Sequence, residues 1–404
     1  MRIVHWYQNF LGGGGVANAV LGLADAQSEL GHEVLLVGME LQQPPLYEPL
    51  APYVRCQVLT WKPKLRLTYG PLDVVMPRRK LIEQLNRWRP DVLHIHGEFL
   101  PSNIWVRRAI SCPSILTPHG VFHPALFDSM NRKPCLRRNL YLRIATLLFY
   151  RRLEAFHALS PVEERQIRKI APSVNVYYLP EGPSVQMDAL LTSQNGDEIR
   201  RISEYRKLIF VGRLDIHTKG LDILLSAFAE AIQLLQSRNI SLILAGPDWR
   251  GGLAVLQDTA RRLRISDRVK FTGSCSSTVL AKLLAEADIF VLLSRREGFS
   301  LSLAEALIAG KPSIVSSEVG SLAYKEVASL PYVYSVKPEI GEAAEAIAYT
   351  VLHLEELRRL AKKEARQAKE FFDWQRIASL HARCYSGLLN GSTVPNHERA
   401  AHQD

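Results

Sequence analysis

Cysteine and long apolar runs are both scarce in this sequence of 404 residues, and each scarcity excludes a class of protein. The five cysteines include no CxxC pair and have no histidine at zinc-ligand spacing, which argues against a disulfide framework and against a metal site. No apolar run is long enough to cross a bilayer, and the chain enters a β-strand at Arg2 without a signal-peptide core. We therefore expect a cytoplasmic protein, with any membrane contact confined to the inner face of the plasma membrane.

The composition is basic, with 50 Lys and Arg residues against 40 Asp and Glu, for a net charge of +10. This balance indicates anionic partners, which include nucleotide sugars, anionic lipid surfaces and nucleic acid. No aromatic-and-basic cluster or nucleic-acid-binding motif is present, so we expect no nucleic acid partner. The length predicts two domains of about 200 residues each, because single cores rarely grow beyond about 250–300 residues.

One stretch, from Glu297 to Glu305, joins two carboxylates across a strand-to-helix turn. The apolar run 288–294 before it is typical of a buried parallel strand, and 300–309 after it predicts a helix that ends at Gly310. A second apolar run, 313–317, completes a βαβ unit. Glu297 should therefore lie at the carboxyl end of a parallel strand, where open α/β sheets bind ligands.

The turn suits a phosphorylated sugar. The backbone N–H groups of Phe299 to Ser302 are expected to be free at the helix start and to attract an anion. Glu297 could accept sugar hydroxyls, and Glu305, one turn into the helix, could accept both hydroxyls of a ribose diol. The alternative is that both are ordinary surface acids of a first helical turn.

Two cations precede this turn in the second half of the chain. Arg213 follows the apolar run 208–212, and Lys219 precedes a predicted helix over 223–235. An arginine fork and a mobile lysine charge suit a diphosphate. The alternative is a pair of solvated surface cations.

The segment from Ser294 to Ala306, with Ala309-Gly310-Lys311-Pro312 and the Gly212-Arg213-Leu214 and Lys219-Gly220 pairs, resembles glycosyltransferase family four. The resemblance implies an α/β protein of the GT-B type, with two Rossmann-like domains whose parallel sheets face a central cleft. It also implies a retaining transferase that needs neither metal nor cofactor. By resemblance, Glu297 contacts the transferred sugar, Glu305 binds the nucleotide ribose, and Arg213 and Lys219 stabilise the leaving diphosphate. The turn residues Gly298, Phe299, Ser300 and Leu301 would bind the donor.

The run Gly12 to Gly15 near the start allows two interpretations. Gly12-x-Gly14-x-x-Ala17 matches the Rossmann fingerprint, and Glu40 lies where a ribose-binding acid belongs, which keeps an NAD(P)-dependent oxidoreductase open. However, a run of glycines matches many patterns by chance. By resemblance to family four, Gly13, Gly14 and Gly15 face the donor diphosphate across the cleft.

Three histidines lie on or directly after two predicted strands of the first half. His94 and His96 alternate onto one strand face, which is compatible with a metal pair, although a structural role is favoured without acidic or thiolate neighbours. His119 follows the next strand, and by resemblance it lies near the sugar and the leaving phosphate. The family usually has Pro-Asn-Gly where this chain has Pro180-Glu181-Gly182, which puts in doubt any contact of the missing Asn.

We expect an acceptor domain over 1–182, a linker over 183–206, a donor domain over 207–370, a helix over 371–389 that crosses back to the first domain, and a loose tail over 390–404. A basic amphipathic helix over 136–157 could pack into the core or contact an anionic membrane.

The expected activity is transfer of a hexose-type sugar from a nucleoside diphosphate sugar to an acceptor hydroxyl. The nucleoside diphosphate of the donor is expected to be UDP or GDP. The acceptor would be a saccharide or glycolipid of cell-surface polysaccharide synthesis, which is the commonest use of the family. The alternatives are the oxidoreductase named above, a non-catalytic nucleotide-sugar-binding relative, and an epimerase of the same fold, which also binds a nucleotide sugar between two such domains.

Overall fold

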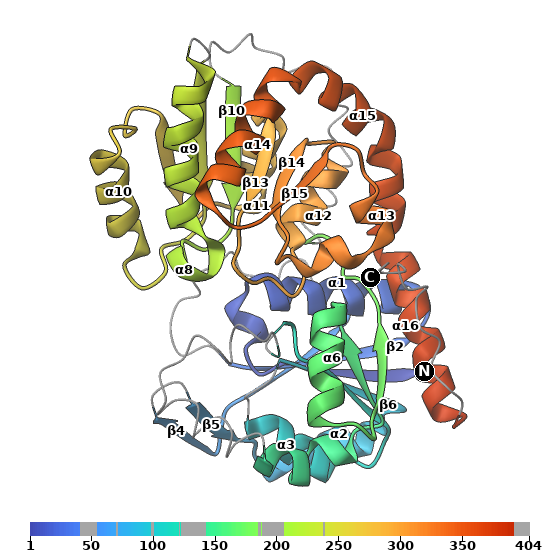
Figure 1. Cartoon of the computed structure of the whole chain (residues 1–404). Helices are drawn as coiled ribbons and strands as arrows, with labels where there is room; N and C mark the ends of the chain where they lie inside the picture. Colours follow the sequence, from blue (N-terminus) through green and yellow to red (C-terminus); the bar gives the residue numbers. More distant parts are fainter. Residues whose placement is uncertain are drawn as a thin grey trace. The chain divides into compact units, whose positions relative to one another are not determined.

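A computed structural model describes residues 1–40, 55–69, 72–97, 101–120, 122, 143–184, 187, 206–236 and 239–391 of the chain. The described residues form two compact units (Figure 1). The first contains the residues up to Gly182 and those from Asp373 onward, and the second runs from Pro183 to Phe372. The expected linker lies mostly, and the expected tail almost entirely, outside the described residues.

The first unit is built on a parallel sheet of seven strands in the order β3-β2-β1-β6-β7-β8-β9. Its strands are β1 (Arg2–Trp6), β2 (Glu33–Met39), β3 (Gln57–Trp61), β6 (Val92–His96), β7 (Ser114–Thr117), β8 (Ala155–Ala158) and β9 (Asn175–Tyr178). An antiparallel pair, β4 (Leu65–Tyr69) and β5 (Leu72–Met76), lies outside this sheet. The strand order reverses between β1 and β6, and the crevice at such a reversal is where open α/β sheets bind ligands.

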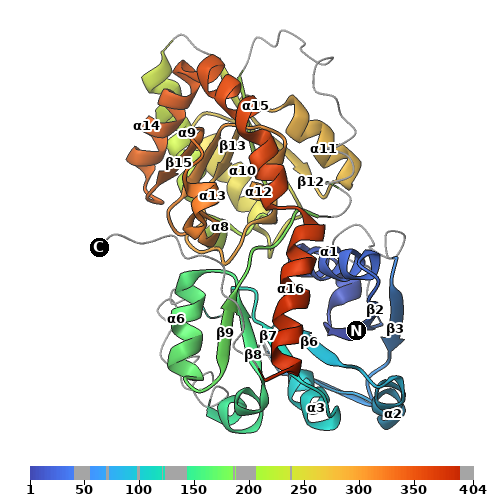
Figure 2. The same cartoon turned by 90° about the vertical axis from the view of Figure 1, so that its right-hand side faces the viewer.

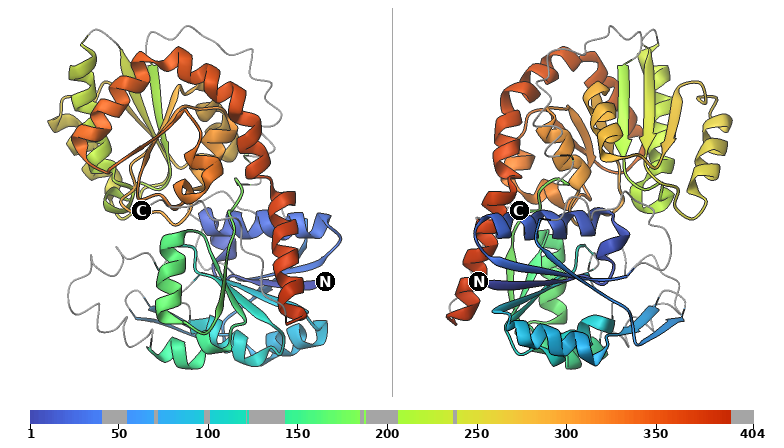
Figure 3. Two further views of the ribbon diagram at one scale, coloured as in Figure 1. Left: turned by 45° about the vertical axis from the view of Figure 1, so that its right-hand side comes forward. Right: turned by 180° about the vertical axis from the view of Figure 1, so that it is seen from behind.

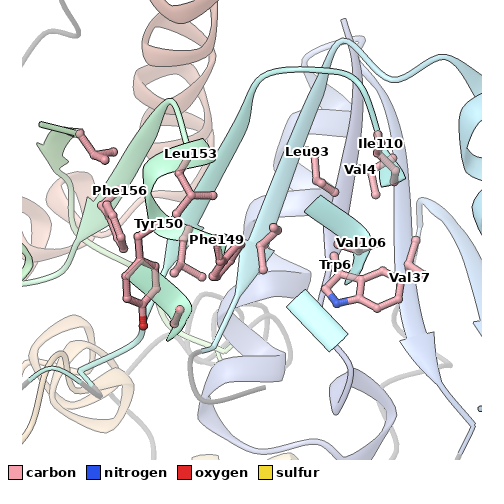
Figure 4. Close-up of a cluster of buried hydrophobic side chains, with 14 of the residues drawn as sticks. Val4, Trp6, Val37, Leu93, Val106, Ile110, Phe149, Tyr150, Leu153 and Phe156 are labelled. Atoms are coloured by element: carbon pink, nitrogen blue, oxygen red, sulfur yellow. The ribbon is translucent and has the colours of Figure 1, made fainter. Parts of the chain in front are cut away.

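Helices cover both faces of this sheet, as Figures 2 and 3 show. They are α1 (Gly15–Glu29), α2 (Arg79–Trp88), α3 (Pro101–Ala109), α6 (Pro161–Ile170) and α16 (Trp374–Leu389), with the 3₁₀ turns η1 (Phe10–Gly12) and η3 (Tyr150–Arg152). Alternate side chains of β1 point to opposite faces of the sheet and therefore belong to two different hydrophobic cores. Val4 and Trp6 pack with Val106 of α3 (Figure 4), whereas Ile3 packs with Tyr385 of α16 on the opposite face.

The C-terminal helix α16 returns to the first unit and packs on α1. It begins at Trp374, later than the expected residue 371, because the Asp373 side chain accepts the N–H of Arg376 at 2.8 Å and caps it there. Gly22 of α1 makes room for this contact. A Cβ added at Gly22 would lie 2.2 Å from the Trp374 ring.

The second unit is a parallel sheet of six strands in the order β12-β11-β10-β13-β14-β15. The strands are β10 (Arg206–Val211), β11 (Ile240–Ala245), β12 (Val269–Gly273), β13 (Ile289–Leu292), β14 (Ser313–Ser316) and β15 (Val333–Val336). The helices are α8 (Ile216–Lys219), α9 (Leu221–Leu235), α10 (Gly252–Arg262), α11 (Ser277–Glu286), α12 (Leu301–Ile308), α13 (Lys325–Ala328), α14 (Ile340–Leu352) and α15 (Leu354–Phe371), with a 3₁₀ turn η4 (Gly320–Ala323). Here the order reverses between β10 and β13, so the loops after these strands meet at one edge.

The prediction of one helix over 136–157 is wrong in its second half. Residues 136–142 lie outside the described residues, and 143–148 are helical, but the chain then forms η3 and the strand β8. Pairing of β8 with β7 and β9 overrides the helical pattern, and His157 is buried on that strand. Ile144, Leu147 and Leu148 are exposed, and contact of this segment with an anionic membrane stays a prediction. No described helix is both long and apolar enough to cross a membrane.

We expect Gly22→Ala to lower the midpoint of thermal unfolding, because the added methyl group overpacks the α1 and α16 contact at a cost of about 1–3 kcal/mol. The matched control is Gly341→Ala in α14, where an added Cβ meets no atom within 4 Å, so helix propensity should leave its stability equal or higher. Equal midpoints for Gly22→Ala and the parent protein, measured by circular dichroism, would contradict the packing described for α16.

Candidate active site

The loop that carries Glu297 is held by backbone hydrogen bonds at the carboxyl edge of the second unit's sheet. The N–H of Glu297 donates to the carbonyl of Glu318 at 3.2 Å, and the N–H of Gly320 donates to the carbonyl of Glu297 at 2.8 Å. These two bonds make a parallel bridge between Glu297 and Val319. The carboxylate therefore extends from a fixed backbone position beside the ends of β13 and β14.

Lys219 forms an ion pair with Glu297, and both side chains are largely buried, at 14% and 17% exposed. The Ser294 hydroxyl donates to the same carboxylate oxygen at 3.3 Å. The two loops can approach because of Gly220, where a Cβ would lie only 2.0 Å from the carbonyl oxygen of Leu293. Two residues that are 78 positions apart are thus brought into direct contact.

The start of α12 differs from the expectation of four free N–H groups. Ser300 is the N-cap and its hydroxyl accepts the N–H of Leu303, while its own N–H donates to the Ser321 hydroxyl at 3.1 Å. The Phe299 side chain is buried against Tyr324, so only its backbone could serve a ligand. No acidic residue lies in the first turn of α12, and the N-terminal end of the helix dipole is therefore not neutralised there.

Glu305 is buried on α12 and interacts with the segment that enters the second unit. The backbone N–H and the hydroxyl of Ser184 both donate to Oε1 of Glu305, at 3.2 and 2.6 Å. Burial raises the pKa of Glu305 to about 7, although the two bonds from Ser184 act to lower it. Glu305 is therefore not the solvated surface acid of the alternative interpretation, and the carboxyl can change charge near neutral pH.

Arg213 lines a cavity of about 430 Å³ beside the loops that follow β10 and β11. Its guanidinium lies 4.8 Å from the centre of the Trp249 ring, and that of Arg250 lies 5.4 Å from the same centre. Arg296, next to Glu297 in the chain, also lines the cavity. Burial lowers the pKa of Arg296, as does the nearby charge of Arg213.

The cavity carries more positive than negative charge. Its described lining includes three arginines and one carboxylate, that of Asp215, which lies 3.3 Å from Arg213. Neither Arg250 nor Arg296 has a carboxylate within salt-bridge distance among the residues that the structure describes. Sequence reasoning missed Trp249, Arg250 and Arg296, and only the position of Arg296 beside Glu297 could have suggested it. The cavity is suited to a multiply charged anion.

In the first unit, Gly13, Gly14 and Gly15 form the entry to α1. Gly13 has φ 71° and ψ −159°, and Gly14 has φ 87° and ψ −179°, a region that only glycine adopts readily. Gly14 is the N-cap and contributes no side chain, and no acid lies in the first turn of α1. No side chain of the N-cap therefore competes with an anionic group for the N–H groups at this helix start.

His119 follows β7 in the left-handed region, with φ 57°. Both of its ring nitrogens have partners, because Nε2 lies 3.1 Å from Nδ1 of His96 and Nδ1 lies 2.9 Å from Oε1 of Glu181. His119 and Glu181 are both largely buried, at 5% and 10% exposed. His119 is therefore oriented by its neighbours in the first unit.

The nitrogens of His5, His94 and His96 lie close enough together for a metal ion. However, both ring nitrogens of each already form hydrogen bonds with protein groups, to Gln27 and His96 from His5, to Tyr385 and Thr117 from His94, and to His5 and His119 from His96. A metal would have to replace these bonds. The contacts favour the structural interpretation of His94 and His96.

The fold and the site together define a class of protein. Two parallel-sheet α/β units, with cations and carboxylates at the carboxyl edge of the second sheet, are the GT-B architecture. The structure is similar to sucrose-phosphate synthase from Thermosynechococcus elongatus, with a TM-score of 0.71 and 21% identity over 97% of this chain and all of that one. It is also similar to HepE from Anabaena, solved with UDP and glucose, with a TM-score of 0.70 and 18% identity over 96% of this chain and all of that one.

The sequence comparisons then give the family. Residues 194–368 match the glycosyl transferases group 1 model, and residues 14–182 match the glycosyl transferase 4-like domain. The chain belongs to this family of glycosyltransferases.

Curated relatives agree with this assignment. N-acetyl-alpha-D-glucosaminyl L-malate synthase from Bacillus anthracis is 25% identical over 94% of this chain and 95% of its own length. Mannosylfructose-phosphate synthase from Agrobacterium fabrum is 23% identical over 90% of this chain and 84% of its own length. Glycogen synthase from Mycobacterium tuberculosis is 28% identical, but the match spans only 47% of this chain and 44% of that protein.

Proposed function

We propose that this glycosyltransferase moves a hexose-type sugar from a nucleoside diphosphate sugar, UDP or GDP, to an acceptor hydroxyl, with retention at the anomeric carbon and without a metal. The observation that carries the proposal is the cationic cavity of the second unit, which is lined by Arg213 and Arg296. The ion pair of Lys219 and Glu297 lies at the same carboxyl edge of the sheet. A diphosphate is the ligand that several guanidinium groups and a lysine bind best. HepE, a structural neighbour, was solved with UDP-glucose.

In this proposal the cations serve the leaving group. As the bond from the anomeric carbon to the phosphate oxygen breaks, negative charge collects on the diphosphate. Arg213 and Lys219 would stabilise that charge in the role that a divalent ion has in other folds. Lys219 is already oriented by its ion pair with Glu297, so little reorganisation is needed when the donor binds.

Glu297 and the turn after it would bind the donor itself. The Glu297 carboxylate accepts hydroxyls of the transferred sugar, and the backbone of Gly298, Phe299 and Leu301 contacts the phosphate. The Ser300 hydroxyl holds this turn by capping α12. The Gly13 to Gly15 loop and His119 of the first unit would serve the donor diphosphate, which is supported by the absence of a side-chain cap and of an acidic residue in the first turn of α1.

Retention follows when the acceptor hydroxyl attacks the face that the diphosphate leaves. The acceptor oxygen forms the new bond to the anomeric carbon, the bond to the phosphate oxygen breaks, and that phosphate oxygen takes the proton. No protein nucleophile is required, which is consistent with a Glu297 carboxylate that is paired with Lys219. The nucleotide ribose would be bound by Glu305, through the oxygen that Ser184 leaves unused.

The acceptor is proposed to be a saccharide or glycolipid of cell-surface polysaccharide synthesis. The relatives named above include enzymes whose names specify a sugar phosphate or malate as part of the product, which supports an acceptor with an acidic group as an alternative. Glu40, which an oxidoreductase would need for its cofactor ribose, forms an ion pair with Lys62 at 3.3 Å instead.

The proposal predicts which ligands stabilise the protein. One nucleoside diphosphate and its sugars should raise the thermal midpoint in the absence of metal, since a ligand at a hundredfold its dissociation constant adds about 2.7 kcal/mol. A thermal-shift panel that includes NAD and NADP tests this. Stabilisation by NAD or NADP alone would indicate the oxidoreductase, and binding of a nucleotide sugar without turnover would indicate a non-catalytic relative.

Loss of either cation should slow the transfer. We expect Arg213→Ala and Lys219→Ala to lower turnover by on the order of 10²–10³, as the loss of a charge-stabilising donor does elsewhere. Lys282→Ala removes an exposed cation of α11 and serves as the matched control with unchanged turnover. Steady-state rates with the donor from the panel provide the measurement, and parental rates for both site variants would rule out the assigned roles.

Glu305 should make donor binding depend on pH. Because burial raises its pKa to about 7 and the ionised form accepts hydroxyls better, affinity for the nucleotide sugar should rise by up to about tenfold from pH 6 to pH 8. The nucleotide sugar is the suitable probe, since its diphosphate has no ionisation near pH 7. Calorimetry on Glu305→Gln should show weaker binding and no such pH dependence. A similar slope in both proteins would place the titrating group elsewhere.

A further inference from the structure

A chain of buried hydrogen bonds crosses the first unit from the carbonyl of Leu179 to His119. Beyond that carbonyl, its members are histidines and neutral polar side chains, and the described contacts are continuous from end to end. In order they are Leu179, His157, Thr117, His94, Tyr385, Gln27, His5, His96 and His119. Because each neutral histidine donates at one nitrogen and accepts at the other, the direction of the chain can be worked out from one end.

The carbonyl oxygen of Leu179 can only accept, so His157 must carry its proton on Nε2, 3.0 Å away. Burial lowers the pKa of His157 to about 3, and the ring is therefore neutral with Nδ1 as an acceptor. The Thr117 hydroxyl, 2.9 Å from that nitrogen, must donate to it. Thr117 has then used its only proton and must accept from Nε2 of His94 at 2.7 Å.

The Tyr385 hydroxyl lies between His94 and Gln27 in this chain of hydrogen bonds. Burial lowers the pKa of His94 well below its usual value, as do the neighbouring histidines, so Nδ1 of His94 accepts from the Tyr385 hydroxyl at 2.7 Å. That hydroxyl can then only accept from Gln27, at 3.3 Å. The amide of Gln27 therefore directs its nitrogen to Tyr385 and its oxygen to His5, which fixes an orientation that distances alone would leave open.

Between Gln27 and His119 every donor points away from His119 and toward Gln27. His5 must donate from Nε2 to the Gln27 oxygen at 2.7 Å, and burial, which lowers its pKa to about 4, leaves Nδ1 as an acceptor. His96 donates from Nε2 to that nitrogen at 2.9 Å, and its Nδ1 must accept from Nε2 of His119 at 3.1 Å. Burial lowers the pKa of His96 as well.

His119 is therefore a donor at Nε2, and its other nitrogen faces a carboxylate. Nδ1 lies 2.9 Å from Oε1 of Glu181, and two acceptors do not form a contact at that distance without a proton between them. The pair must hold one proton more than a neutral imidazole and a carboxylate hold separately. Charge-assisted hydrogen bonding then favours an imidazolium at His119 beside a carboxylate at Glu181.

The other groups that face His119 are compatible with this state. The Glu163 carboxyl of α6 accepts the N–H groups of Gly120 and Leu159, at 2.7 and 3.1 Å, and burial raises its pKa to about 7. His96 of β6 and His157 of β8 are neutral, for the reasons given above. The one ionised partner in direct contact with His119, among the described residues, is Glu181.

We propose that Glu181 is a positioning residue, and that together with the chain from Leu179 it holds His119 as an imidazolium of fixed orientation. The functional part of this inference rests on the proposed function, in which His119 serves the leaving diphosphate. Both ring nitrogens are engaged, so His119 acts through its charge and through the turn it forms with Gly120. This chain has Glu181 between Pro180 and Gly182. Its carboxylate accepts the hydrogen bond from the additional proton on Nδ1 of His119.

The test uses ring-nitrogen NMR of the full chain labelled with ¹⁵N-histidine, which needs no substrate. In the parent protein near neutral pH we expect His119 to give an imidazolium signal, and His5, His94, His96 and His157 to give neutral rings protonated on Nε2. His119→Gln identifies the His119 signal by its loss. A neutral His119 in the parent spectrum, or His5 or His96 protonated on Nδ1, would overturn the proposal.

The decisive variant is Glu181→Gln. Its amide nitrogen can donate to Nδ1 of His119, so the hydrogen bonds remain while the extra proton and both charges are lost. We expect a neutral His119 signal and a decrease in kcat of roughly 10–100-fold with little change in KM for the donor, as for outer carboxylates that orient histidines elsewhere. Glu164→Gln, at similar burial on α6, is the control. It should change neither the His119 signal nor kcat.

The two readouts separate the two claims. A His119 that stays an imidazolium in Glu181→Gln would overturn the assignment of the proton to this pair. An unchanged kcat with a neutral His119 would overturn the positioning role. If the parent protein transfers no sugar with any donor while the NMR result holds, the proposed function fails and the protonation of the pair stands.

Discussion

The ion pair between Lys219 and Glu297 is the contact on which the second unit's site depends. Both groups are largely buried, and a buried charge that loses its partner destabilises the structure strongly. The loops that carry them are tied by backbone bonds as well, since the N–H of Arg295 donates to the carbonyl of Thr218 at 3.0 Å. The pair therefore keeps the ends of β10 and β13 together, and in the proposed function the charge of Lys219 is in place before the donor binds.

The two units use polar groups in opposite ways. The second unit gathers guanidinium groups around a cavity and leaves part of their charge uncompensated, which favours an anionic ligand. The first unit buries several histidines whose pKa values fall on burial, so that they stay neutral and satisfy one another. Burial explains the difference, because desolvation penalises charge on the buried histidines, whereas the cavity arginines stay partly exposed to solvent.

Much of the second unit's candidate site could be predicted from the sequence. The alternation of apolar runs with helix signals around Glu297 located a βαβ unit, and the structure has β13, α12 and β14 there. The GT-B fold was likewise predicted and is confirmed. The roles of Arg213, Lys219, Glu297 and Glu305 stay predictions. The number of free N–H groups was overestimated, because Ser321, which is 21 residues away, takes the N–H of Ser300.

By itself, the sequence determined the βαβ unit around Glu297, since its elements follow from local periodicity, glycine positions and caps. It also determined which residue types lie at strand ends, where ligands bind. Only the tertiary structure decided that Lys219 pairs with Glu297, that Trp249 lies against Arg213, and that the segment 155–158 is a strand instead of helix. These contacts join residues far apart in the chain, and the energies that select them, pairing of strands and compensation of buried charge, depend on neighbours that no local pattern specifies.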